Sequence, residues 1–158
     1  MIEEALKRIE VARREKLTYL DLSGMGLKEV PSEILDITWL KTLSLADNEL
    51  SDISGLSALQ QIHKLALSHN KIVDITPLSR LKKLKFLFLE GNAIKDVSAL
   101  KTTTTLKKLV LTNNTIFSID NLDGLTALVY LDVALNPLNM SELMAYKQRM
   151  PSLLVYNI

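Results

Sequence analysis

An eleven-residue pattern of leucines and one asparagine returns at a nearly constant interval along the chain. In LKTLSLADNEL, residues 40–50, leucine occupies the first, fourth, sixth and eleventh places and asparagine occupies the ninth. Four further copies follow at intervals of 22 residues, beginning at Ile62, Leu84, Leu106 and Leu128. A degenerate copy begins at Leu17 and has Met25 at its ninth place. Repetition with a constant period of this length predicts a stack of similar coils.

Within one repeat, the pattern predicts a short strand followed by a turn. Because strand side chains alternate, the leucines at places four and six point the same way, into a core. The asparagine follows where the chain turns, and its amide can both donate to and accept from backbone groups that the turn leaves unpaired. An unsatisfied buried amide costs roughly 1 to 3 kcal/mol. We therefore expect a buried, hydrogen-bonded ladder made of Asn48, Asn70, Asn92, Asn114 and Asn136.

The second half of each repeat, such as SDISGLSALQQ, has an apolar residue at about every third position. This spacing suits a 3₁₀ segment, with three residues per turn, better than a long α-helix. In KTTTTL, Thr103 replaces the isoleucine or leucine found at positions 37, 59, 81 and 125. A threonine fills less volume and its hydroxyl needs a partner, so we expect the outer side to be softest there. The alternative is that the four threonines form a locally adapted turn.

Composition limits the possible classes of protein. The chain has 158 residues, 47% of them hydrophobic, a net charge of +1 and no cysteine. This size and apolar content predict one domain over residues 1–158 with a continuous core. The lack of cysteine excludes disulfide staples and thiolate metal sites. No stretch resembles a signal peptide or a bilayer span, so we expect a cytoplasmic protein without a membrane segment, unless a leader was removed.

The pattern LxxLxLxxNxL at 22-residue spacing resembles the leucine-rich repeat family over residues 17–138. The repeat length and the backs DISGLSALQ and DITPLSRLKKL resemble the short-repeat subclass of the protein-phosphatase-1 regulatory subunit and the internalins. The resemblance implies an α/β fold, a right-handed solenoid shaped as a horseshoe arc. A parallel sheet would line its concave side, and 3₁₀ or short helical segments its convex side.

Both ends of the chain resemble the capping segments that a solenoid needs to cover its exposed apolar cross-sections. Residues 1–16 predict a helical cap with one face formed by Ile2, Ala5, Leu6, Ile9 and Ala12. The start of the chain resembles bacterial leucine-rich repeat proteins. Residues 139–158 are expected to form the second cap, because the family's carboxy-terminal pattern is matched by Asn136, Pro137, Leu138, Tyr146, Pro151 and Leu153. Six repeats would occupy residues 17–138, and two caps imply a whole domain.

Strand places that alternate with the buried leucines predict the residues of the concave surface. Phe86, Phe88, Val110 and Tyr130 should form an exposed apolar cluster with lysines around it. Clustered exposed aromatics have the composition of a protein-binding hot spot, although single surface aromatics are common. The predicted partner-binding residues are Tyr19, Lys64, Phe86, Phe88, Glu90, Lys108, Val110, Tyr130 and Asp132.

Other kinds of site find little support in the sequence. His63 and His69 have no third ligand placed beside them, so no metal, cofactor or catalytic site is predicted. Nothing resembles a nucleophile elbow or a phosphate-binding glycine loop. Aspartates at the repeat loops, Asp47, Asp52, Asp74 and Asp96, are expected to bind turn backbone. Lysines on the strands suit nucleic acid poorly, because Asp21, Glu90 and Asp132 share their surface.

These observations predict a noncatalytic, monomeric module that binds an unidentified partner protein through the concave sheet. Small-molecule substrates, nucleic acid and membranes are not predicted partners. A secreted bacterial effector or adhesin that engages a host protein is the alternative, and detection of the protein outside the producing cell would favour it. The family's known partners cannot be transferred, because no family binding motif matches these concave residues.

Overall fold

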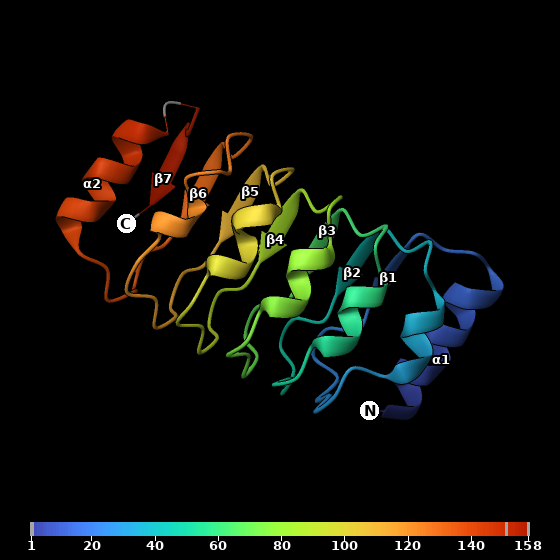
Figure 1. The fold of residues 1–158 in the computed structure, drawn as a ribbon. Helices are drawn as coiled ribbons and strands as arrows, with labels where there is room; N and C mark the ends of the chain where they lie inside the picture. Colours follow the sequence, from blue (N-terminus) through green and yellow to red (C-terminus); the bar gives the residue numbers. More distant parts are fainter. Residues whose placement is uncertain (1, 151, 158) are drawn as a thin grey trace.

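The computed structural model describes residues 2–150 and 152–157, in which seven strands form one parallel sheet in chain order (Figure 1). The sheet confirms the predicted α/β solenoid, with one strand contributed by each coil. A seventh strand, which the sequence did not predict, is added by the carboxy-terminal cap. The strands are β1 (Tyr19–Asp21), β2 (Thr42–Ser44), β3 (Lys64–Ala66), β4 (Phe86–Phe88), β5 (Lys108–Val110), β6 (Tyr130–Asp132) and β7 (Val155–Asn157).

Neighbouring strands pair place for place, which explains the constant interval between repeats. Thr42 pairs with Lys64 and Leu43 pairs with Leu65, and the same register continues through β6. The leucine in the middle of each strand is therefore stacked on the leucine of the next strand. The first interval is one residue longer, yet Leu20 still pairs with Leu43, because the extra residue lies outside the strands.

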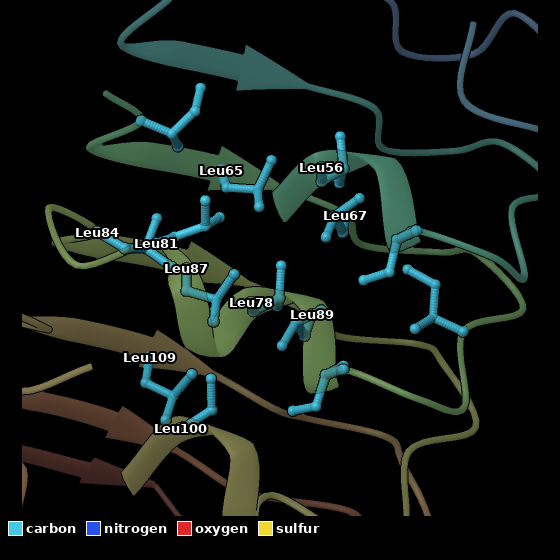
Figure 2. Packing of buried hydrophobic residues seen from close by; sticks show 14 of the residues in the cluster. Leu56, Leu65, Leu67, Leu78, Leu81, Leu84, Leu87, Leu89, Leu100 and Leu109 are labelled. Carbon is cyan, nitrogen blue, oxygen red and sulfur yellow. The ribbon is translucent and has the colours of Figure 1, made fainter. Parts of the chain in front are cut away.

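Short 3₁₀ segments cover the face of the sheet opposite the concave surface (Figure 1). Their residue spacing places one apolar side chain per turn toward the sheet, as the sequence predicted. Figure 2 shows Leu56, Leu78 and Leu100 from these segments lying against strand leucines such as Leu65 and Leu87, and all five are buried. The segments are η1 (Ser32–Asp36), η2 (Ser54–Ala58), η3 (Thr76–Arg80), η4 (Ser98–Thr102) and η5 (Asp120–Leu122).

The asparagine ladder joins consecutive coils through side-chain hydrogen bonds. Asn70 Oδ1 accepts from Leu50 N at 2.9 Å, while its Nδ2 donates to Leu45 O at 2.9 Å and Leu67 O at 3.0 Å. Four coils repeat this arrangement with equivalent atoms. Asn48, Asn70 and Asn114 are buried, while Asn92 and Asn136 are half-buried.

The first coil lacks a ladder asparagine, and Asn48 of the second coil makes one bond to it, from Met25 N, that has no equivalent in the other coils. Asn48 Oδ1 accepts from Met25 N at 3.1 Å and from Leu27 N at 2.9 Å. Met25 is itself buried, so it adds apolar contact in place of the amide. The degenerate first repeat is therefore held by its neighbour.

At the amino-terminal end, α1 (Ile2–Arg14) covers the first coil. Ala5, Ile9 and Ala12 are buried, as the helical spacing predicted. The expectation that Ile2 and Leu6 belong to the same buried face is wrong, because they are 52% and 36% exposed. The coil beneath covers only the stripe at Ala5, Ile9 and Ala12, and Ile2 and Leu6 fall at its margin.

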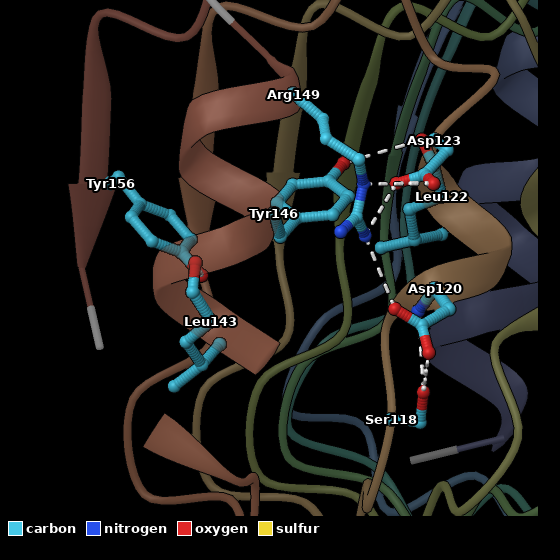
Figure 3. Close-up of polar contacts among 8 residues, drawn as sticks. All are labelled: Ser118, Asp120, Leu122, Asp123, Leu143, Tyr146, Arg149 and Tyr156. Atoms are coloured by element: carbon cyan, nitrogen blue, oxygen red, sulfur yellow. Dashed lines mark hydrogen bonds and ion pairs between the residues drawn. The ribbon is translucent and has the colours of Figure 1, made fainter. Parts of the chain in front are cut away.

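At the carboxy-terminal end, α2 (Met140–Arg149) covers the last coil. Figure 3 shows Tyr146 pointing toward η5, where its buried hydroxyl donates to Leu122 O at 3.2 Å. Arg149 lies beside it and pairs with Asp123 at 3.1 Å and Asp120 at 3.2 Å. Tyr156 donates to Leu143 O at 3.2 Å, and its burial raises its pKa to about 12. Leu153 is buried as expected, whereas Pro151 lies outside the described residues.

The hydroxyl of Thr103 finds a partner inside the fold. Thr103 is fully buried, and its Oγ1 donates to Leu100 O at 2.5 Å. The polar atom therefore carries no unsatisfied hydrogen bond. Local softness of the outer side at Thr103 stays a prediction.

Candidate functional site

The concave face presents two rows of side chains, from the first and third residue of each strand. Strand alternation places these residues opposite the buried middle leucine. The first row becomes aromatic and basic from β3 to β6, where it contains Lys64, Phe86, Lys108 and Tyr130. Consecutive members of this row are direct register partners, so they lie side by side on adjacent strands.

Phe88, in the second row of β4, is flanked by two lysines of the first row. Lys64 Nζ lies 5.7 Å and Lys108 Nζ 5.5 Å from the centre of its ring. Lys108 Nζ also lies 4.2 Å from the ring centre of Tyr130. Ammonium groups at such distances are attracted to the ring faces by about 0.5–1 kcal/mol at exposed sites. These residues, together with Phe86, form what we call the aromatic patch: Lys64, Phe86, Phe88, Lys108 and Tyr130.

The aromatic patch is open to solvent, although not uniformly. Phe86 is 38% exposed, and Phe88 and Tyr130 are half-buried. The expectation that Val110 is exposed is wrong, because its side chain is only 7% exposed. Val110 lies between Phe88 and Asp132 in the register, and its short side chain is covered by larger neighbours. Val110 therefore offers little surface to a partner.

Acidic side chains border the patch near the ends of the strands. Glu90 Oε1 lies 3.1 Å from His69 Nε2. Asp132 Oδ2 accepts a hydrogen bond from Asn157 Nδ2 at 3.0 Å, and the same amide donates to the hydroxyl of Tyr130 at 3.3 Å. Desolvation raises the pKa of Asp132, but hydrogen bonds from Asn157, Thr112 and Ala134 N, together with the charge of Lys108, outweigh it and lower the pKa below its ordinary value.

Asn157 is a site residue that the sequence did not reveal. It lies on β7, outside the repeated pattern, so no spacing rule pointed to it. Its pairing with Asp132 and Tyr130 fixes two predicted contact residues in place. A sequence pattern showing that the carboxy-terminal cap adds a strand beside β6 would have been needed to predict the position of Asn157.

Tyr19 is exposed, but the structure does not bring it to the aromatic patch. Its side chain is 62% exposed on β1, and strands β2 and β3 separate it from β4. A groove of about 320 Å³ between α1 and β1 is lined by Tyr19, Val11 and Arg8, among others. The predicted contact residues therefore divide into the patch with its acidic border and an isolated tyrosine.

Neither histidine belongs to a cluster of three possible metal ligands in the described part of the chain, although Glu90 lies beside His69. Within residues 2–150 and 152–157, no three His, Cys, Asp or Glu side chains gather closely enough to hold a metal ion. His63 is half-buried, and burial and the charges of Lys85, Lys41 and Lys83 lower its pKa. In the same part of the chain, no helix has the length and apolarity needed to cross a membrane.

Two models of known protein families match the repeats. A family model described as "Leucine Rich repeats (2 copies)" matches residues 60–102, and one described as "Leucine Rich repeat" matches residues 36–59. The two matches adjoin, and both follow the phase of the observed coils. The chain is a leucine-rich repeat protein. Its short repeats are of the internalin type.

Solved structures show the same architecture. The internalin InlF of Listeria monocytogenes has a TM-score of 0.73 and 28% identity over 92% of this chain. Internalin C2 of the same species has a TM-score of 0.78 and 17% identity over 97% of this chain, a likeness that shows the fold alone. The leucine-rich repeat ectodomain of the Arabidopsis thaliana receptor kinase GASSHO1/SCHENGEN3, solved in complex with CASPARIAN STRIP INTEGRITY FACTOR 2, has a TM-score of 0.72 and 24% identity over 88% of this chain.

The matched structures differ in length from this leucine-rich repeat protein. The chain spans 49% of the InlF structure, 91% of the internalin C2 structure and 18% of the receptor ectodomain. No match was found among curated proteins. Leucine-rich repeat folds serve in general as protein-interaction modules, and this chain has that fold.

Proposed function

We propose that this leucine-rich repeat protein is a noncatalytic module that binds a partner protein through its concave sheet, centred on the aromatic patch. The observation that carries the proposal is the pair of lysines over Phe88, beside an exposed Phe86, on three adjacent strands of the concave face. Aromatic residues held together on a surface are enriched at the centres of protein interfaces.

The fold favours binding because it fixes the contact residues in advance. Each side chain of the aromatic patch projects from a strand that is paired on both sides, and the asparagine ladder holds the turns that follow. Little ordering entropy is therefore lost on association. The GASSHO1/SCHENGEN3 ectodomain complex supports the general role, since a leucine-rich repeat domain of similar fold holds another molecule.

Affinity capture with matched variants tests the proposal. The wild type is compared with Phe86→Ala/Phe88→Ala, and Phe117→Ala serves as control because Phe117 is 63% exposed but lies outside the strands. We expect a partner retained by the wild type and the control to be lost from the double variant. Circular dichroism would verify that all three proteins are folded. A partner retained equally by all three would contradict the proposal.

The similarity to two internalins favours a second candidate, a secreted bacterial effector or adhesin that engages a host protein. The two candidates share the binding surface and differ in where the partner is met. We propose the cytoplasm as the location and a monomer as the working state. Fractionation of the producing cells and sedimentation equilibrium test these two proposals, and accumulation of the chain in the medium would favour the effector or adhesin.

A further inference from the structure

A row of basic residues runs along the edge of the sheet where the strands begin. Backbone hydrogen bonds of 2.8 Å connect its members, because His63 N donates to Lys41 O, Lys85 N to His63 O and Lys107 N to Lys85 O. These four residues are therefore stacked at the spacing of adjacent strands, about 4.8 Å. Lys41 and Lys107 are exposed, and His63 and Lys85 are half-buried.

No carboxylate interrupts this edge over five coils. The segments 37–42, 59–64, 81–86, 103–108 and 125–130 contain seven lysines and no aspartate or glutamate, although the whole chain has a net charge of only +1. The first coil differs, since Glu15 lies there and pairs with Arg14 at 2.9 Å. We call the lysines of the five segments the basic edge: Lys41, Lys64, Lys82, Lys83, Lys85, Lys107 and Lys108.

The charges of the basic edge are not neutralised inside the molecule. Among the described residues, 2–150 and 152–157, none of the seven lysines forms a salt bridge. Burial first, and then the charges of Lys85, Lys41 and Lys83, lower the pKa of His63. This direction is the one that a concentration of positive charge at the edge produces. A surface field of one sign attracts and steers partners of the opposite sign.

The basic edge is continuous with the aromatic patch, because Lys64 and Lys108 belong to both. Along β4 the concave surface changes from Lys85 at the edge to Phe86 and Phe88 and then to Glu90, while Asp132 lies level with Phe88 two strands away. A uniform polyanion spread over the face would meet those carboxylates. A protein segment with carboxylates on one side and an apolar side chain on the other fits this surface. Its carboxylates can meet the lysines of the edge, and its apolar side chain can lie on the aromatic rings beside them.

We propose that the partner contributes an acidic, extended protein segment, which lies along the basic edge and places an aromatic or aliphatic side chain on the aromatic patch. Its carboxylates face the stacked Lys41, Lys85 and Lys107. The inference deepens the proposed function and rests on it. Since the ion pairs lie at the rim of the contact, the association rate falls as salt concentration rises.

Fluorescence anisotropy with defined peptides tests this inference. The probe is a fluorescein-labelled peptide of glutamate interspersed with phenylalanine. Its binding is compared among the wild type, Lys41→Gln/Lys85→Gln/Lys107→Gln, and the matched control Lys28→Gln/Lys95→Gln/Lys101→Gln, which removes three exposed lysines outside the basic edge. We expect the first variant to bind about tenfold more weakly, because exposed ion pairs are individually weak and three are removed. The control should bind like the wild type.

Three results would overturn the inference. They are failure of the glutamate–phenylalanine peptide to bind the wild type, equal weakening in both triple variants, and tighter binding of oligothymidylate or phosphatidylserine vesicles than of the peptide. The captured partner separates this inference from the proposed function. If Lys41→Gln/Lys85→Gln/Lys107→Gln retains a partner that Phe86→Ala/Phe88→Ala loses, the proposal of an acidic segment is wrong, and the proposal of binding through the concave sheet is retained. If Phe86→Ala/Phe88→Ala retains the partner, the proposed function fails.

Discussion

Single asparagines connect the coils of the solenoid, and Asn70 illustrates how much depends on one amide. Its Oδ1 accepts from Leu50 N, and its Nδ2 serves carbonyls of two successive coils. We predict that Asn70→Ala lowers the free energy of unfolding by about 3 kcal/mol, because several buried backbone groups lose their partner together. Urea unfolding measures the loss. The exposed Asn121 provides the control, since Asn121→Ala should change stability by less than about 0.5 kcal/mol.

The residue before each ladder asparagine, and before Met25 at the same place in the first coil, has a left-handed backbone conformation. Five of the six coils use residues at this place that accept a positive φ or are polar: Gly24, Asp47, His69, Gly91 and Asn113. Leu135 is the exception, with φ at 57° and a side chain that is 76% exposed.

Replacing Leu135 should relieve this backbone cost. We predict that Leu135→Asn raises the free energy of unfolding by about 1 kcal/mol, because asparagine tolerates the left-handed region better than leucine and little packing is lost. Leu154→Asn is the control, since Leu154 is also exposed but has no positive φ. Equal effects of the two substitutions on the urea midpoint would show that the gain in stability comes from replacing an exposed leucine and not from the left-handed backbone.

At the scale of the element, an aspartate lies two residues before each of the segments η2, η3 and η4. Asp52, Asp74 and Asp96 accept hydrogen bonds of 2.7–2.8 Å from the backbone N of the residue two positions later. The expectation for these three aspartates is confirmed. Asp47 differs, because it occupies the left-handed position before Asn48. Hydrogen bonds from Ser54, Thr76 and Ser98 lower the pKa of the three carboxyl groups.

These lowered pKa values predict an acid-dependent stability. A carboxyl whose pKa is lower in the folded state stabilises fully above its unfolded pKa of about 3.9, and that stability is lost as pH falls through the folded value. The urea midpoint should therefore fall below about pH 4. Asp52→Asn/Asp74→Asn/Asp96→Asn keeps the acceptor oxygens without the ionisation, so its midpoint should depend less on pH in this range. Glu29→Gln, which replaces an exposed carboxylate outside these turns, should retain the wild-type dependence.

The carboxy-terminal cap depends on Tyr146, which is fully buried and bonded to η5. We predict that Tyr146→Ala costs about 3–5 kcal/mol, the range for removing a large buried aromatic side chain. Since each coil contacts mainly its neighbours, the loss should begin at the end of the solenoid. Hydrogen exchange should show amides of β6 exchanging before those of β2. Met144→Ala on the same helix is the control, because Met144 is 61% exposed.

At the scale of the molecule, periodicity made the solenoid predictable from sequence. A leucine that returns every 22 residues determines the register of each strand on the next, and the asparagine determines where each turn lies. Residues without a repeated equivalent were predicted less well. β7 and Asn157 belong to the cap, and Ile2 and Leu6 lie beside a helix whose covered width depends on tertiary packing.

The sequence predicted on which face of the sheet the site residues lie, but not how deeply each side chain is buried. Alternation along the strands put Phe86, Phe88 and Tyr130 on the concave face. It could not show that Val110 is covered by its neighbours, because burial there depends on side-chain sizes on adjacent strands. Nor did it reveal the basic edge, since the lysines of different coils come together only when the strands stack. The extent of one cooperative domain over residues 1–158 stays a prediction.

Photo-crosslinking of the partner tests concave binding most directly. A photoreactive phenylalanine analogue is placed at position 86 on the concave face or at position 117 outside the strands, and each protein is irradiated with the captured partner. The account predicts a crosslinked complex from position 86 and none from position 117. A crosslink from position 117 without one from position 86 would contradict it.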